Sequence, residues 1–462
     1  MLLADAPDDS GLLHALSEFS AVISVLFPAY LLLLVLPLLV RRTRRPGKAE
    51  DYAWHLFVPC RDEEAVIGDT LAYLRASCPT AHLWVVDDDS EDGTGDIVRR
   101  FAIRDPGVHL VQRRRPEARQ GKGEALNAAY RALCAWLPAQ ADRRRVIVGV
   151  FDADGRPAPG CLDFVAARRY FGRQEVGGVQ IEVRMLNRTE RHPNPEAGAL
   201  RNFADRLLIR MQDLEFRAPV AALQHARKAS RSVCLGGNGQ FVRLAALDDL
   251  NAERGRPWTG RLLEDFELGM HLLLAGWINS FCAETYVEQE ALYDPRRFLT
   301  QRTRWAQGVM QCFTYIVRIW RSDRIPNTGF LELSFFLAQP WLQLIGALLY
   351  PVPLMVLATS YARHPHAAAH YLASGGWIGI AAYLVMTVGQ FVVWGPIYRG
   401  KCERDSGFWQ SIGWGLAYPF YLLSLYVVSW RAVARIVTGR NGWAKTRRNA
   451  EGRTTGPVAK EA

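Results

Sequence analysis

Short apolar runs alternate with longer amphipathic stretches over the first 150 residues. Four runs are rich in β-branched and aromatic residues and predict strands, at 54–58, 82–86, 108–112 and 146–150. The stretches between them predict helices, at 65–77, 95–104 and 123–137. Strands that alternate with helices of 10–15 residues are typical of an α/β fold with a parallel, doubly wound sheet.

A longer apolar stretch precedes this region. Residues 21–40 carry no charge and are long enough to cross a bilayer. The residues before them are acidic (Asp5, Asp8, Asp9 and Glu18), the opposite of the basic start of a signal peptide, so we predict a retained anchor. The basic run at 41–45 follows directly and predicts a cytoplasmic location for the chain beyond it.

Three further apolar stretches, 333–361, 376–398 and 407–430, occur late in the chain. The link 399–405 is basic, and the tail 431–462 has eight Lys/Arg against two Glu, so both favour the cytoplasm. Three crossings from a cytoplasmic domain would leave the tail outside. We therefore expect one stretch, Leu331–Trp341, to lie in the membrane interface.

These boundaries divide the chain into seven parts. They are an N-terminal segment (1–20), a transmembrane helix (21–40), a basic linker (41–51), an α/β domain (52–315), an interfacial segment (316–341), a transmembrane region of two to three helices (342–430) and a basic tail (431–462). The net charge of +10 comes largely from clusters beside apolar stretches, which favours membrane lipids over nucleic acid as the partner. The eight cysteines form no Cys-x-x-Cys pair, so neither a zinc site nor a disulfide framework is indicated.

Acidic residues follow the predicted strands. Asp152 and Asp154 come directly after the strand at 146–150, and Asp87 to Asp89 follow the strand at 82–86. Ligands of open α/β sheets bind beyond the carboxyl ends of the strands. Paired carboxylates there suit Mg²⁺ or Mn²⁺ on a diphosphate, although Asp-x-Asp taken alone is more often a solvated turn. Lys122, between two glycines at a predicted helix start, also suits a diphosphate.

Six motifs occur in the order that a known family shows. They are VVDDDSEDGT (85–94), GKGEALN (121–127), DAD (152–154), GGNGQFVR (236–243), LEDFELG (263–269) and QRTRW (301–305). Over residues 52–315 the chain resembles inverting family-2 glycosyltransferases with the GT-A fold. Its membrane context is similar to that of cellulose, chitin, hyaluronan and poly-N-acetylglucosamine synthases and of monoglucosyldiacylglycerol synthases.

The resemblance implies roles for the donor side of a site. It implies Mg²⁺ or Mn²⁺ on Asp152 and Asp154, with Asp154 the stronger candidate. It implies a UDP-sugar donor held by residues that follow the first strands and by the Gly-Lys-Gly loop, namely Asp62, Asp87, Asp88 and Lys122.

The acceptor side follows from the later motifs. The family's Thr-Glu-Asp motif ends in the catalytic base, which corresponds to Asp265, with Leu263 in place of the threonine. The same acids also suit a plain helix N-terminus. The resemblance implies that the acceptor or product is bound by Gly237, Glu264, Gln301, Arg304 and Trp305. The alternative for QRTRW is a helix at the membrane interface, where Trp and Arg are common.

The sequence leaves three functions open. The favoured one is transfer of glucose or N-acetylglucosamine from a UDP-sugar to a growing β-linked polysaccharide, at the inner or plasma membrane. The alternative is a glycolipid synthase that transfers glucose to a lipid such as diacylglycerol. About four spans are few for a polymer channel unless a homo-oligomer supplies more. The third, a non-catalytic scaffold, is disfavoured because Asp154 and Asp265 are both present.

Overall fold

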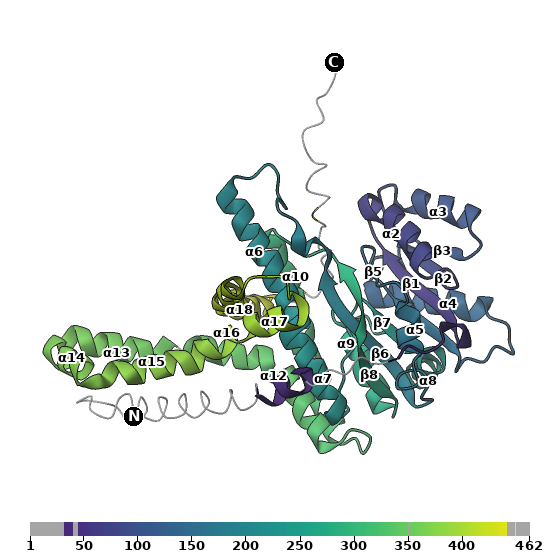
Figure 1. Ribbon diagram of the computed structural model, residues 1–462. Coiled ribbons are helices and arrows are strands. Elements are labelled where there is room, and N and C mark those ends of the chain that lie inside the picture. Colours follow the sequence, from purple (N-terminus) through teal and green to yellow (C-terminus); the bar gives the residue numbers. More distant parts are fainter. Residues whose placement is uncertain (1–31, 40–44, 350, 441–448, 450–462) are drawn as a thin grey trace.

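A computed structural model describes residues 32–39, 45–349, 351–440 and 449 (Figure 1). The predicted anchor at 21–40 lies mostly outside these residues. Its described part, 32–39, is helical, and Leu34 and Leu38 are buried in one apolar cluster with Trp394 and Trp414. Most of the predicted basic tail also lies outside the described residues.

Eight strands form one sheet in the order β3-β2-β1-β4-β7-β6-β8-β5. The first four are parallel, as predicted: β1 (Ala53–Cys60), β2 (His82–Asp88), β3 (Val108–Arg113) and β4 (Val146–Val150). The helices that connect them are α2 (Glu64–Ser77), α3 (Thr94–Arg104) and α4 (Lys122–Trp136). The alternation that the apolar pattern predicts is confirmed.

The prediction of a parallel sheet is wrong for the second half. The later strands are β5 (Arg156–Pro157), β6 (Val176–Met185), β7 (Gln240–Arg243) and β8 (Ile278–Gln289). Strand β7 runs antiparallel to β4 and β6, and β5 runs antiparallel to β8, while β6 and β8 are parallel. The sheet is therefore mixed. The reason is that the regular alternation of strands and helices ends after β4, and the four-residue β7 follows a long helical segment.

Helices cover both faces of the sheet. One face packs against α2, α3 and α5 (Cys161–Ala166), and the other against α4, α8 (Leu244–Arg254) and α9 (Glu264–Leu274). Because helices cover both faces, β4 is apolar and buried at every position.

Histidines stack at the amino ends of the first strands, far along the sheet from the acidic motifs. The rings of His55 and His82 lie 5.3 Å apart, and those of Trp84 and His109 lie 4.2 Å apart, with Trp136 beside them. Burial lowers the pKa of His55 to about 3, and the neighbouring His82 adds to the shift.

Helices after β6 and β8 build a second layer beside the sheet (Figure 1). A short helix, η1 (Ala49–Asp51), precedes β1 and contacts α5 instead. The helices of the second layer are η2 (Leu186–Thr189), α6 (Ala199–Glu215), η3 (Phe216–Val220), α7 (Ala221–Ser230), α10 (Pro295–Cys312), η4 (Phe313–Tyr315), α11 (Ile316–Trp320) and α12 (Asn327–Leu349). The remainder are α13 (Pro351–Arg363), α14 (Pro365–Tyr371), η5 (Leu372–Gly376), α15 (Trp377–Leu384), η6 (Val385–Gly389), α16 (Gln390–Val392), α17 (Trp394–Cys402) and α18 (Phe408–Val437). Helices α13 to α15 form an arm that extends away from the sheet.

Two helices within the described ranges, α12 and α18, are long and apolar enough to cross a membrane, although length and composition alone do not establish a crossing. Helix α18 has two different faces. One face packs on α10 and α17 and buries Trp414, Tyr418, Tyr421 and Val428. The opposite face exposes an apolar stripe with spacings of three, four and seven residues: Trp409, Leu416, Phe420, Leu423, Val427, Trp430 and Val437.

Candidate active site

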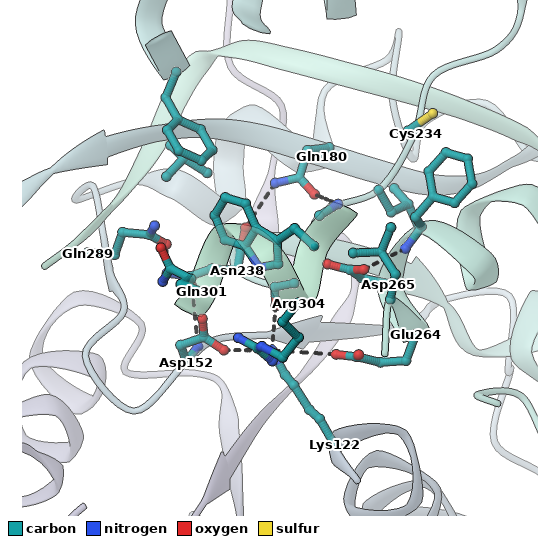
Figure 2. Close-up of a pocket in the computed structure, with 18 of the residues that line it drawn as sticks. Lys122, Asp152, Gln180, Cys234, Asn238, Glu264, Asp265, Gln289, Gln301 and Arg304 are labelled. Atoms are coloured by element: carbon teal, nitrogen blue, oxygen red, sulfur yellow. Dashed lines mark hydrogen bonds and ion pairs between the residues drawn. The ribbon is translucent and has the colours of Figure 1, made fainter. Parts of the chain in front are cut away.

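A cavity of about 410 Å³ lies at the carboxyl ends of β1, β2 and β4 and extends beneath α7, α10 and α12 (Figure 2). Most of the predicted site residues line it: Asp88, Lys122, Asp152, Gly237, Glu264, Asp265, Gln301, Arg304 and Trp305. The structure therefore brings together residues that are up to 217 positions apart, from Asp88 to Trp305. Asp62, Asp87 and Asp154 do not line this cavity.

Lys122 joins the two halves of the site. It is the first residue of α4, and the preceding Gly121 has a φ of 129°, which side chains rarely allow. Its Nζ lies 2.6 Å from Asp152 Oδ1, 3.3 Å from the Gly237 carbonyl oxygen and 3.9 Å from Glu264 Oε1. Burial alone would lower the pKa of Lys122, but Asp152 and Glu264 outweigh burial and the pKa is raised.

A tight contact fixes the start of α4 against the loop before α9. A Cβ placed on Gly123 would lie 2.1 Å from the Thr259 carbonyl oxygen and 3.4 Å from the Glu264 Cβ. Only glycine allows this approach, so the backbone beside Lys122 rests directly on the segment that leads to Glu264 and Asp265.

Two acids begin α9, where the helix dipole favours negative charge. The Phe266 N–H donates to Asp265 Oδ1 at 2.7 Å. Burial raises the pKa of Glu264 to about 7, and the Asp265 carboxylate adds to the shift, while Lys122 opposes it. Burial also raises the pKa of Asp265, against the opposing effect of Lys122. The site thus holds two carboxylates whose protonation changes closer to neutral pH than usual.

The glycine-rich loop at 236–239 forms the floor between these groups. The Gly236 N–H donates to Gln180 Oε1 at 2.7 Å, and Gln180 Nε2 donates to the Asn238 carbonyl at 2.9 Å. A Cβ on Gly237 would lie 3.0 Å from both Asp265 Oδ2 and Lys122 Nζ. The loop therefore approaches the base candidate closely, as its glycines predict. Gln180 carries no motif, and sequence reasoning missed it.

Helix α10 presents one face to the cavity and another to α18. Its start is capped by Asp294, which accepts from the Arg297 N–H at 2.8 Å, with Pro295 in the first turn. Gln301, Arg304 and Trp305 share the cavity face at i, i+3 and i+4 spacing.

Arg302, in the same motif, points the other way. It forms a bidentate ion pair with Glu215 at 2.9 and 2.6 Å, and it donates to Tyr421 Oη at 3.0 Å. Its guanidinium carbon also lies 4.5 Å from the Trp305 ring centroid. One motif thus serves the cavity and the packing of α18 on the domain.

The acids predicted to bind the nucleotide occupy different positions. Asp88 lines the cavity, is ion-paired with Arg113 and accepts from the Arg119 N–H at 3.1 Å. Asp87, on the opposite face of β2, accepts from the Ser90 N–H at 3.0 Å. Asp62 accepts from the Glu91 N–H at 2.8 Å. The Asp62 bond joins the loops after β1 and β2, the Asp87 bond lies within the loop after β2, and the Asp88 bonds tie that loop to the segment after β3.

The metal prediction rests on Asp152 and Asp154. Across the described part of the chain, no group of three His, Cys, Asp or Glu side chains could hold a metal ion. Asp152 lines the cavity, and Asp154 Oδ2 accepts from the Glu290 N–H at 2.9 Å. These two carboxylates, two residues apart in sequence, fit Mg²⁺ or Mn²⁺ in chemical type, because such ions take one or two protein carboxylates and complete their coordination with phosphate and water.

Much of the remaining cavity lining is apolar. It includes Phe216, Leu223, Val309 and Phe336, from η3, α7, α10 and α12. No motif marks this part of the lining. Only the tertiary fold brings the helices η3 and α7 beside α12.

Comparison with known proteins identifies the class. Residues 53–308 match a family model described as "Glycosyltransferase like family 2". The chain belongs to this family, and it is a glycosyltransferase.

Individual relatives refine the picture. The chain is 28% identical to the beta-monoglucosyldiacylglycerol synthase of Synechocystis sp. over 85% of this chain and 74% of that one. It is 25% identical to the enzyme of the same name from Nostoc sp., over 85% and 75%. Its structure is similar to the mannosyltransferase PcManGT of Pyrobaculum calidifontis, determined with GDP-Man and Mn²⁺, with a TM-score of 0.53, 19% identity and coverage of 91% and 98%. This likeness supports the predicted GT-A type of α/β fold.

Proposed function

We propose that this glycosyltransferase transfers a sugar, such as glucose from UDP-glucose, to the hydroxyl of a membrane lipid such as diacylglycerol. The observation that carries the proposal is the mixed lining of the cavity, in which the polar Lys122, Asp152 and Asp265 occur together with many apolar side chains. An acceptor with a hydroxyl head and an apolar body matches this lining. The names of the two cyanobacterial relatives support a lipid acceptor. The order of our two hypotheses is therefore reversed, with the lipid ahead of the polysaccharide.

Asp265 acts as the general base in this proposal. A sugar-accepting hydroxyl is a poor nucleophile until a positioned carboxylate takes its proton. As the proton moves to Asp265, the hydroxyl oxygen attacks the anomeric carbon from the face opposite the diphosphate. The bond from that carbon to the diphosphate oxygen breaks, and an α-linked donor gives a β-linked product.

Positive charge at the donor end stabilises the leaving diphosphate. Lys122 supplies part of it from its position between Asp152 and Glu264. Asp152 and Asp154 would hold Mg²⁺ or Mn²⁺, which neutralises the developing charge on the nucleoside diphosphate when bound. The Mn²⁺ in the mannosyltransferase neighbour supports a divalent ion.

The remaining predicted residues complete the two subsites. Asp62, Asp87 and Asp88 shape the loops that hold the nucleoside. On the acceptor side, Gln301, Arg304, Trp305, Gly237 and Glu264 surround the reacting hydroxyl.

We infer that the protein works at the cytoplasmic face of the inner or plasma membrane. The Arg302–Glu215 pair contacts α18 at Tyr421, close to the middle of that helix. If α18 crossed the bilayer, it would carry this ion pair to the hydrocarbon core, which is costly. We therefore propose that α18, and not Leu331–Trp341, is the segment that lies in the membrane interface. Its apolar stripe then faces the lipid. The helices from α12 to α16 then cross twice and return the basic tail to the cytoplasm.

A product assay tests the proposal. Membranes that carry the protein are incubated with Mn²⁺ or Mg²⁺ and with radiolabelled UDP-glucose, UDP-N-acetylglucosamine or GDP-mannose, in the presence of diacylglycerol. Membranes with Asp265→Asn are the matched control. We expect label in the organic-soluble fraction with a UDP-sugar. Label in polymeric product alone would overturn the lipid acceptor, and label from GDP-mannose alone would overturn the uridine donor.

A further inference from the structure

Two polar side chains occur among the apolar ones that line the cavity. Arg227 and Gln224 sit on one face of α7, three residues apart, and both line the cavity although they are only 3% and 7% exposed. Arg227 Nε donates to Glu332 Oε1 on α12 at 3.1 Å. Gln224 Nε2 donates to the Cys234 carbonyl at 2.8 Å.

Each of these side chains also has one atom with no hydrogen bond to any described residue. These atoms are Arg227 Nη2, a donor, and Gln224 Oε1, an acceptor. Burying a polar atom without a partner costs free energy. Because both residues line the cavity, a ligand bound there can supply a partner. The Arg227 guanidinium carbon lies 4.7 Å from the Phe336 ring centroid, which limits its movement.

The charge balance decides what kind of partner fits. Glu332 already neutralises Arg227, so an anionic ligand would gain little net attraction. An anion would also meet the lone pairs of Gln224 Oε1. A neutral carbonyl oxygen can accept from Arg227 Nη2 without adding a second negative charge beside Glu332, and it repels the Gln224 oxygen less than an anion would.

We propose that Arg227, held by Glu332, donates a hydrogen bond to an ester carbonyl of an acyl lipid acceptor whose hydroxyl lies at Asp265. This inference rests on the proposed function and adds the feature by which the lipid is recognised. The wall next to Arg227 is α12, whose outer surface exposes the apolar Leu331 and Phe335. An acyl chain that passes along Leu223 and Phe336 would leave the cavity beside that surface.

An ester-to-ether comparison tests the assignment. The purified full chain in mixed micelles receives labelled UDP-glucose and either 1,2-dioleoylglycerol or its dialkyl ether analogue, which lacks both carbonyls. A hydrogen bond from a charged donor predicts a kcat/KM about 10- to 100-fold higher for the ester. In the double variant Arg227→Met/Glu332→Gln, which removes both charges together, the ratio should fall to near 1.

A matched control uses Lys228→Met, which removes a neighbouring cation whose Nζ lies over the Tyr170 ring and not in the cavity wall. Its ester-to-ether ratio should equal that of the unsubstituted protein, and melting temperatures show that each variant folds.

Each outcome of the comparison has a distinct meaning. Equal use of ester and ether by the unsubstituted protein, or a preference that survives in the double variant, overturns the inference alone. A polyprenyl phosphate acceptor that outperforms both and depends on Arg227 overturns the neutral carbonyl. No labelled lipid with any acceptor overturns the proposed function and this inference together.

Discussion

Replacing Asp265 by Asn tests the proposed base at its reacting atom. The change keeps size and shape and removes only the proton-accepting oxygen. The Phe266 N–H can still donate to the amide oxygen, so the first turn of α9 should persist. Loss of a general base lowers kcat by about 10²- to 10⁴-fold, which equals about 2.7–5.4 kcal/mol in activation free energy.

Residual activity of the Asp265→Asn variant would arise from a second carboxylate in the site. Glu264 is the nearest alternative carboxylate, with a pKa of about 7. Because the Asp265 charge contributes to that raised pKa, Asp265→Asn should lower the pKa of Glu264 and leave more of it ionised. If Glu264 supports residual turnover, the fall in kcat should therefore be closer to about 10²-fold than to about 10⁴-fold. Glu264→Gln in the unsubstituted background should cost less than Asp265→Asn.

The assay is glycolipid formation measured from pH 5 to 9, with UDP-glucose binding measured separately by calorimetry. A base works only when ionised, so kcat/KM of the unsubstituted protein should fall as the pH drops through the raised pKa of Asp265. The Asn variant should lose the limb that Asp265 sets, and any acid limb that remains should follow the pKa of Glu264, while donor affinity stays the same. Turnover close to that of the unsubstituted protein would refute the assignment. Loss of donor binding would instead give Asp265 a role in shaping the donor site.

Three further predictions concern stability and the metal. Arg302→Met leaves Glu215 buried without its partner and should destabilise the protein by about 3–5 kcal/mol, visible as a lower melting temperature that Arg302→Met/Glu215→Gln largely restores. The pKa of His55, about 3, lies below its usual value, so its contribution to stability is present above pH 6.5 and is lost as pH falls towards 3. His55→Gln should therefore reduce the fall of the melting temperature between pH 6.5 and 5. A melting temperature that falls with pH as steeply as in the unsubstituted protein would contradict this. Asp154→Asn should raise the Mn²⁺ concentration for half-maximal activity about tenfold or more, and an identical metal titration would remove Asp154 from the metal site.

The first half of the fold could be predicted because each of its strands and helices has a recognisable pattern within its own residues. Each of the strands β1 to β4 is a short apolar run, and each connecting helix has its own periodicity. Parallel strands carry their carboxyl ends to one edge, so acids after those strands were expected to meet, and Lys122, Asp152 and Asp88 do lie around one cavity.

Other features depend on contacts that no local pattern encodes. Strand β7 has only four residues, and no pattern within them encodes its antiparallel insertion between β4 and β6. Asp87 and Asp88 are neighbours in sequence, yet the alternation of a strand sends only Asp88 to the cavity. The polar pair on α7 joins the site only because α7 packs against α12.

The contact between Gly123 and Thr259 limits how the two parts of this enzyme can be exchanged. The donor end is built from the first half of the chain and the acceptor end from the second, which invites chimeras that combine the donor preference of one relative with the acceptor preference of another. A larger side chain at position 123, or a loop at 259 with a different path, would separate Lys122 from Glu264 by the width of a methyl group or more. A working chimera must therefore take residues 121–127 and 259–265 from the same parent, even though they belong to different ends of the site.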